Sequence, residues 1–353
     1  GLHPDMRILI TGNLGYIGPT VAQHLRRAIP GATLIGLDAA FFGHCLTGVL
    51  AFPERVLDLQ HVADIRDVSG EMLDGVDVVV NLAAISNDPM GNQFEAQTAG
   101  INHAAGIRLA REAKQRGVKA FVFASSCSVY GFADAAPRTE ESSLDPLTAY
   151  ARSKVASEKD LTGLADDQFL VTCLRFATAC GWSDRLRLDL VLNDFVASAI
   201  ASGEIHILSD GTPWRPLIHV TDMARAIEWA ATRRPSDGGA FVVVNAGSDG
   251  WNHQVRDLAH AVASAFPSVK VSVNTQAAPD RRSYRVDFAR FRELAPNHQP
   301  RMTLDGAIAG LKEGLLRMGF ADRDFRKSQW IRLHTLRAHL ESGRLTDDLR
   351  WRL

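Results

Sequence analysis

Short apolar runs alternate with helical patterns along the first half of the chain. The run Val76–Leu82 is almost continuously apolar, which is typical of a strand that is buried on both faces. Between such runs, apolar residues recur at helical spacing, as at Val21, Leu25 and Ile29. The predicted strands are Met6–Thr11, Thr33–Leu37, Arg55–Leu57, Val76–Leu82, Ala120–Ala124 and Leu170–Phe176, and the predicted helices include Tyr16–Ala28, Gly100–Arg116 and one that carries Tyr150.

Repeated strand–helix–strand units of this length predict an α/β fold with a doubly wound parallel sheet. The second half is less regular, with predicted strands Ala240–Asn245 and Val269–Asn274 and predicted helices Asp189–Ser202, Thr221–Thr232, His253–Phe266, Leu304–Arg317 and Arg326–Glu341. In the last of these helices Trp330, Leu333, Leu336, Arg337 and Leu340 share one face, which we interpret as core or subunit packing. We therefore expect a sheet domain at 6–176, to which segments at about 218–246 return, and a smaller mixed α/β domain over most of 177–353.

Composition limits the possible partners of the protein. The 353 residues are 46% hydrophobic and 22% charged, with a formal net charge of −1, which suits a large core and two domains. Because there is no basic block, no nucleic-acid partner is expected. Because there is neither an apolar run of ~18 residues nor a signal peptide, we expect a cytoplasmic protein without a membrane span. The cysteines and histidines show no disulfide or metal-ligand spacing, so reduced thiols and no metal site are expected.

A glycine-rich turn joins the first predicted strand to the first predicted helix. In Thr11–Gly18 (TGNLGYIG) the glycines are three residues apart, as in turns that bring a pyrophosphate to a helix N-terminus. Asp38 ends the next strand, twenty residues beyond Gly18, where a carboxylate can bind both ribose hydroxyls of NAD and repel the additional phosphate of NADP. The predicted cofactor is therefore NAD, bound by Gly12, Gly15, Tyr16, Ile17, Gly18 and Asp38.

Tyr150 and Lys154 form a second candidate site. Four residues apart, they lie on one face of a helix, a single turn from each other. A fixed ammonium group stabilises a phenolate and lowers its pKa from about 10, so such a pair can exchange a proton with a substrate hydroxyl. The spacing alone also occurs in many exposed helices.

Together, the TGxxGxxG turn and the later Tyr-x-x-x-Lys resemble the extended short-chain dehydrogenase/reductases. The nucleotide-sugar epimerases and dehydratases are the most similar branch, and the resemblance runs from Met6 to about Arg285. It implies a Rossmann domain that holds NAD, a nucleotide-diphosphate sugar as substrate, and a homodimer formed through residues 101–115 and 150–164.

The resemblance implies roles for further residues around the cofactor. Asp58-Leu59 resembles a pair that meets the adenine, and Leu82-Ala83-Ala84 resembles a loop that lies against the cofactor. Asn102 matches an asparagine that is structural or close to the cofactor. In Ser125–Gly131 (SSCSVYG), Ser125 lies beside the cofactor and Ser126 takes the position of the catalytic Ser/Thr. The implied catalytic residues are Tyr150, Lys154 and Ser126, with Cys127 as a weaker candidate, and Tyr150 and Lys154 also contact the cofactor.

Two positions depart from the dehydratase pattern. Family members that are 4,6-dehydratases follow the catalytic Ser/Thr with Asp-Glu or Ser-Glu, whereas this chain has Cys127 and Ser128. The departure disfavours standard dehydration, because Cys127 and Ser128 do not supply the general acid and base that those residues provide. A thiol could act as an acid or base, but a cysteine is usually a small core residue.

Substrate-side residues follow from the same resemblance. Arg215, in WRPLIHVTD, and Arg282, in DRRSY, match arginines that reach the substrate's diphosphate, a role that suits a guanidinium. A surface pair with Arg281 is the competing interpretation for Arg282. Arg185 and Arg187 are weaker candidates for the sugar pocket, while His219 and Asp222 are interpreted as structural. The predicted substrate-binding residues are Ser86, Asn87, Ser128, Thr178, Asn193, Arg215 and Arg282.

The resulting hypothesis is an NAD-dependent nucleotide-sugar epimerase. In this hypothesis Tyr150 takes a proton from a sugar hydroxyl, Lys154 stabilises the phenolate and Ser126 orients the hydroxyl. A dehydrogenase or ketoreductase and a decarboxylase of uronic sugars would use the same first half-reaction, so the motifs leave them open. A non-catalytic NAD-sensing protein is a further alternative, but it would have no need of all three residues.

Overall fold

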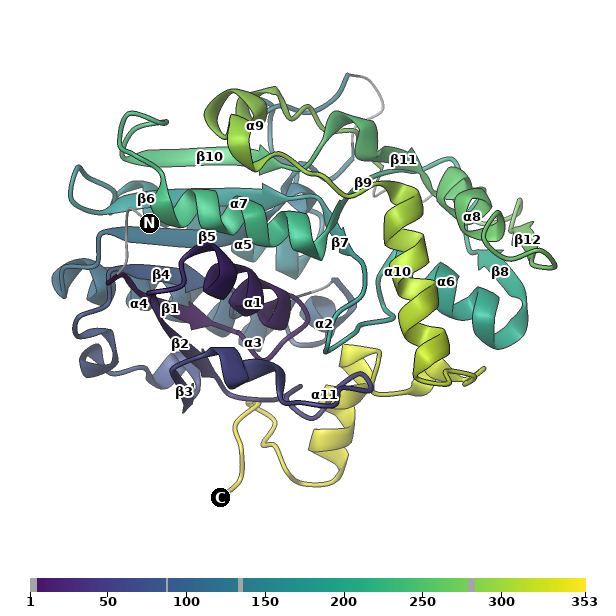
Figure 1. Ribbon diagram of the computed structural model, residues 1–353, viewed down its shortest axis with the longest axis horizontal. Coiled ribbons are helices and arrows are strands. Elements are labelled where there is room, and N and C mark those ends of the chain that lie inside the picture. Colours follow the sequence, from purple (N-terminus) through teal and green to yellow (C-terminus); the bar gives the residue numbers. More distant parts are fainter. Residues whose placement is uncertain (1–4, 87, 133–135, 279–282) are drawn as a thin grey trace.

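The computed structural model describes residues 5–86, 88–132, 136–278 and 283–353, and Asn87, Arg281 and Arg282 lie outside them. Its centre is a seven-stranded parallel sheet in the order β10-β6-β5-β4-β1-β2-β3, which confirms the predicted fold class (Figure 1). Its strands are β1 (Arg7–Thr11), β2 (Thr33–Asp38), β3 (Leu59–Val62), β4 (Val78–Asn81), β5 (Ala120–Ser126), β6 (Leu170–Phe176) and β10 (Phe241–Ala246).

Helices cover both faces of this sheet. On one face α1 (Gly18–Ala28) packs against α7 (Val220–Thr232), and on the other α4 (Gly106–Gln115) packs against α5 (Ala149–Thr162) (Figure 1). Side chains of β1 alternate between two cores: Ile8 and Ile10 belong to one and Leu9 to the other. Such two-sided burial explains why the strands read as continuous apolar runs.

The second half of the chain builds a smaller unit beside the sheet, at the right of Figure 1. It has a three-stranded sheet in the order β11-β9-β7 and a two-stranded sheet of β12 and β8. Its elements are β7 (Thr178–Cys180), α6 (Val191–Ser202), β8 (Glu204–Ile207), β9 (Trp214–His219), β11 (Asn252–Gln254), α8 (Val255–Ala263), β12 (Lys270–Val273) and α10 (Leu304–Arg317). Helix α9 (Ala289–Leu294) lies instead against β10 of the large sheet.

Shorter elements complete the chain. They are α2 (Asp88–Gln93), α3 (Glu95–Thr98), a π-helical stretch (Ala99–Ala105) that leads into α4, and the final helix α11 (Arg332–Glu341). In the part of the chain that the structure describes, no helix is long and apolar enough to cross a membrane.

Two predicted elements differ from the structure. Arg55–Leu57 was wrong as a strand, because residues Pro53–Val56 form a 3-10 helix and the strand is Leu59–Val62. The last helix begins at Arg332 rather than Arg326, with a short 3-10 turn (Phe325–Lys327) before it. The first error moves a predicted site residue, as described below.

Candidate active site

A cavity of about 1310 Å³ lies across the carboxyl ends of the parallel strands. Its lining includes Gly12 after β1, Asp38 at the end of β2, Leu82 after β4 and Ser126 at the end of β5. Parallel sheets bind ligands at this edge, where the strand order reverses. The cavity is therefore the candidate active site.

The glycine-rich turn forms one end of the cavity. Gly12 has φ +70°, and a Cβ there would lie 2.6 Å from Ala83 N, so only glycine fits. A Cβ on Gly18 would lie 1.9 Å from Asn13 O, so the turn and the helix can pack this closely only because residue 18 is a glycine. Gly18 itself lies outside the cavity lining. Helix α1 begins without a side-chain cap and without an acidic residue in its first turn. Its first N–H groups can therefore receive a pyrophosphate, and the fit to NAD is good here.

Asp38 lies in the same end of the cavity. Its Oδ2 accepts a hydrogen bond from Leu14 N at 2.9 Å and its Oδ1 accepts one from Ala40 N at 2.7 Å. Burial raises the pKa of this carboxyl, while the two amides oppose the shift. Each oxygen has a further lone pair, so a fixed carboxylate can accept the two ribose hydroxyls of NAD.

Asp58 and Leu59 do not lie in the cavity lining. Asp58 precedes β3 instead of following it, and its Oδ2 accepts from Leu34 N and Arg26 Nη2. Leu59 is 47% exposed on the edge strand. The residues that follow β3 and line the cavity are Ala63, Asp64 and Ile65. A sequence prediction that placed β3 at Leu59–Val62 would have indicated these residues.

Tyr150 and Lys154 enter the cavity from α5. The helix begins at Ala149, and Thr148 caps it by accepting from Ala151 N, so Tyr150 lies in the first turn. Lys154 is 3% exposed; its Nζ donates to Ala124 O at 2.8 Å and lies 5.2 Å from the Tyr150 ring centroid. Burial lowers the pKa of the Lys154 ammonium to about 8, although Glu158 opposes the shift. The lysine is thus fixed beside the tyrosine.

The lowered pKa of Lys154 predicts a stability cost that depends on pH. In the unfolded chain the lysine keeps its proton up to pH ~10.4, whereas in the fold its pKa is about 8. The unfolded state therefore binds more protons between these values, so this contribution to stability rises with pH across that window and is lowest below it. We expect Lys154→Met to raise the free energy of unfolding by about 2–3 kcal/mol at pH 7. Urea unfolding at pH 7 and pH 9.5 should show a smaller gain at the higher pH; an equal gain at both pH values, or no gain at pH 7, would contradict the prediction.

The serines after β5 lie close to the same point. Ser126 Oγ donates to Ser128 Oγ at 2.8 Å and accepts from Ser128 N, and both side chains line the cavity. Cys127 points away: it is fully buried, its Sγ contacts Arg175 O at 3.1 Å, and burial raises the pKa of its thiol. Outside the lining and held as a thiol, Cys127 is placed as a core residue.

A buried polar network supports these residues from behind. Glu158, one turn after Lys154, accepts from Ser125 Oγ at 2.5 Å and from Arg175 Nη2 at 2.6 Å. Arg175 Nη1 donates to Tyr130 Oη, which donates to Asn245 Oδ1. The carboxylate thereby ties α5 to β5 and β6, the elements that position Lys154 and the serines.

The predicted substrate residues occupy different places. Ser86, Ser128, Thr178 and Arg215 line the cavity, whereas Asn193 is buried outside the lining. Asn102, predicted as structural or close to the cofactor, is likewise buried outside the lining. Asn193 Nδ2 donates to Tyr16 Oη at 3.1 Å, and Asn102 bonds both Ile85 N and Ile85 O. These two asparagines hold the cavity walls. Asn87 and Arg282 lie outside the described residues.

Of the two weaker arginine candidates, both buried, Arg187 is the one that lines the cavity. Its Nε donates to Asp189 Oδ1 at 2.8 Å and its Nη1 donates to Ser86 Oγ at 2.6 Å. Arg185 lies outside the lining, paired with Glu54 at 2.5 Å.

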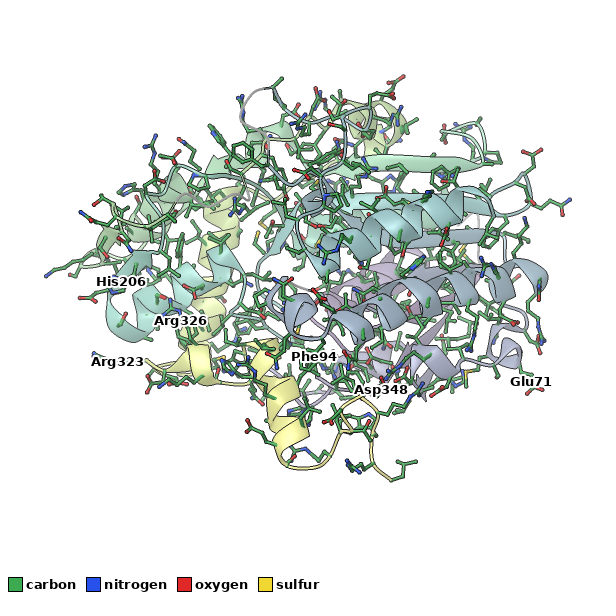
Figure 2. The ribbon with its side chains drawn as sticks, turned by 180° about the vertical axis from the view of Figure 1, so that it is seen from behind. Glu71, Phe94, His206, Arg323, Arg326 and Asp348 are labelled. Carbon is green, nitrogen blue, oxygen red and sulfur yellow. The ribbon has the colours of Figure 1, made fainter. Side chains whose placement is uncertain are left out.

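Sequence reasoning missed several wall residues because they come from distant segments. Arg326 and His206 line the cavity and lie at one end of the molecule in Figure 2. Arg326 Nη2 bonds Asp194 Oδ1 at 2.7 Å, a contact between residues far apart in the chain. Among the described residues there is no group of three or more metal-ligating side chains.

Comparison with known proteins gives consistent matches over most of the chain. The model of the NAD-dependent epimerase/dehydratase family matches residues 8–247. The UDP-glucose 4-epimerase of Mycolicibacterium smegmatis is 29% identical over 313 residues, which cover 86% of this chain and 96% of that protein. An uncharacterised UDP-glucose epimerase of Bacillus subtilis is 28% identical over 237 residues, covering 63% of this chain and 71% of that protein. The structure of MoeE5 in complex with UDP-glucuronic acid and NAD has a TM-score of 0.75 at 25% identity, covering 88% of this chain and 99% of that one.

Proposed function

Because the chain belongs to the NAD-dependent epimerase/dehydratase family, we propose that it is an NAD-dependent nucleotide-sugar epimerase. One observation carries the proposal: Tyr150, Lys154 and Ser126 share a cavity with the glycine-rich turn and Asp38. In this proposal residues 6–176, with about 218–246, hold most of the cofactor, and most of 177–353 holds the sugar nucleotide. We further expect a homodimer through residues 101–115 and 150–164, which light scattering would test.

The residues of the cavity divide the chemistry between them. Bound NAD would accept hydride from the carbinol carbon and return it. Tyr150 Oη takes the proton of the sugar hydroxyl as the C–H and O–H bonds break and the ketone forms. The fixed ammonium of Lys154 stabilises the phenolate, and the Ser126 hydroxyl bonds the same sugar oxygen. After the ketosugar turns over, the returning hydride would meet the other face of the carbonyl carbon, which inverts that carbon, while Tyr150 returns the proton to the oxygen.

The cofactor contacts follow the walls already described. The first N–H groups of α1 and the turn at Gly12 and Gly15 would hold the pyrophosphate. Asp38 would hold the adenosine ribose, and we assign the adenine contact to Asp64 and Ile65 in place of Asp58 and Leu59. Leu82, Ala83 and Ala84 would lie against the cofactor beside Ser125.

At the substrate end, polar side chains come from several elements. Ser86, Ser128 and Thr178 supply hydroxyls for the sugar, and Arg215 supplies a guanidinium for the diphosphate. Arg187 adds a second guanidinium, which is buried and which Asp189 keeps in place. Epimerisation is favoured over dehydration because the Cys127 thiol is buried outside the cavity, so no acid–base pair follows Ser126.

Turnover of a small panel of substrates tests the proposal. The protein would be incubated with UDP-glucose, UDP-galactose and UDP-glucuronic acid, and products separated by ion-exchange chromatography and identified by NMR. The proposal predicts interconversion of two epimers, without net change in NAD redox state. When the incubation is repeated in deuterated water, the product should contain no deuterium. Release of NADH would favour a dehydrogenase, and loss of carbon dioxide from UDP-glucuronic acid would favour a decarboxylase. Bound NAD without turnover of any member would favour an NAD sensor.

A further inference from the structure

The last residues of the chain form part of the cavity wall. Helix α11 and the segment after it run along the edge of the sheet that carries β2 and β3 (Figure 1). Ile331, Arg332 and Leu336 line the cavity, opposite the strand end that presents Asp38. The family model ends at residue 247, so it assigns nothing to this segment. The sequence pattern had indicated packing alone for the face that contains Leu336.

This segment fastens the loop that follows Asp38. Trp351 Nε1 donates to Ala39 O at 2.5 Å, and His339 Nε2 donates to Phe41 O at 2.7 Å. The Trp351 ring centroid lies 5.6 Å from that of Phe41 and 5.0 Å from that of His339. Ala39 and Phe41 line the cavity with Asp38, so these contacts fix the backbone beside the carboxylate.

A second fastening reaches the loop after β3. Arg66 donates from Nη1 to Asp348 O and from Nη2 to Leu349 O, both at 2.7 Å. The same guanidinium donates from Nε to Asp64 Oδ1 at 2.9 Å, and Asp64 lines the cavity. Leu349 is fully buried, and Asp348 is labelled at this edge in Figure 2. The C-terminal segment is therefore bonded to both loops that flank the adenosine end.

Charge favours an anion against this wall. Arg332 is 1% exposed, and its Nη1 and Nη2 donate to the carbonyls of Gln329 and Arg185 rather than to a carboxylate. Burial lowers the pKa of its guanidinium to about 10. Asp189 is the carboxylate on which both Arg187 and Arg332 act, so two buried cations share one anion here. A buried cation is costly without a full counter-charge, and a bound dinucleotide would bring two negative phosphates to this cavity.

We propose that residues 329–351 are a wall of the cofactor site and retain NAD on the protein. NAD leaves the adenosine end only after this segment separates from the loops at Ala39 and Asp64. The inference rests on the cofactor of the proposed function and is independent of the sugar reaction. It makes NAD a resident group rather than an exchanging co-substrate, as an epimerase requires, because such an enzyme returns hydride to the same substrate.

Two variants of the full chain loosen the wall at separate points. Trp351→Ala removes the contact with Ala39. Arg66→Met removes the bonds to Asp348 and Leu349, together with those to Asp64, while keeping most of the aliphatic stem. Arg234→Met is the matched control, since that arginine is exposed, bonds Asp237 and lies outside the cavity lining. Each protein would be loaded with isotopically labelled NAD, desalted, and chased with excess unlabelled NAD while bound label is counted.

We expect both wall variants to lose NAD at least tenfold faster than the wild type, and Arg234→Met to lose it at the wild-type rate. Equal rates for all four proteins would overturn the inference, as would faster loss in the control. Thermal unfolding with excess NAD checks that the variants fold; if Trp351→Ala does not, Arg66→Met decides. If the variants release NAD faster but the protein turns over no sugar nucleotide, the inference about the wall is supported and the proposed function is contradicted. A wild type that binds no NAD would contradict both.

Discussion

Replacing Tyr150 with phenylalanine is expected to lower kcat by about 10²–10⁴-fold, the range for loss of a general acid–base group. The substitution removes one oxygen and leaves the ring that lines the cavity. Lys154 keeps its bond to Ala124 O, so the wall geometry should persist. Initial rates on the substrate identified in the panel would measure the effect, and NAD content would confirm that the cofactor site is intact.

Tyr130→Phe is the matched control for this prediction. This substitution also removes one phenolic oxygen, but the Tyr130 hydroxyl bonds Asn245 and Arg175 in the core, outside the cavity lining. It should cost about 1–2 kcal/mol of stability, because it removes a hydrogen bond within a buried network, and leave kcat near the wild-type value. A Tyr150→Phe protein as active as Tyr130→Phe would exclude Tyr150 as the proton acceptor.

The sequence predicts the cofactor end well because local geometry defines it. A strand, a glycine-rich turn, a helix and the next strand follow one another between Met6 and Asp38, so the spacing of Gly12 and Asp38 already implies their meeting. Tyr150 and Lys154 are similarly local, one helical turn apart. All four of these residues line the cavity in the structure.

Errors arose where local pattern is weak. Arg55–Leu57 is too short to distinguish a strand from a 3-10 turn. The adenine contact was expected at Asp58, which lies outside the cavity lining, whereas Asp64 lies in it. The position of Cys127 could not be read from its neighbours either, because the turn after Ser126 directs alternate side chains to the cavity and to the core. A motif fixes the backbone position but not which side chains face the ligand.

Other wall residues depend on contacts that no local pattern records. Trp351 meets Ala39, and Arg326 meets Asp194, only because the second half folds back across the strand ends. The apolar periodicity predicted a helix at α11, although it placed the first residue at Arg326 instead of Arg332. The same periodicity describes a helix that packs on a core and one that also lines a cavity. Position in the fold, rather than composition, separates the two.

Breaking the buried pair between Glu158 and Arg175 is expected to have the largest effect on stability. Their side chains are each 6% exposed and lie 2.6 Å apart, so Glu158→Leu would leave the Arg175 charge buried without its carboxylate. It would also free the Ser125 hydroxyl in the cavity wall. We expect a loss of about 3–5 kcal/mol in the free energy of unfolding, measured by urea denaturation.

The double variant Glu158→Leu/Arg175→Met separates charge from packing. Because it removes both ions and keeps similar volume, it should recover most of the stability that the single variant loses. Glu313→Leu is the surface control: Glu313 pairs with Arg317 at 3.5 Å with both side chains largely exposed, so the change should stay within about 1 kcal/mol. If single and double variants were equally unstable, Glu158 would act through the shape of its side chain and its bond to Ser125, and the buried arginine would not be the charge that it offsets.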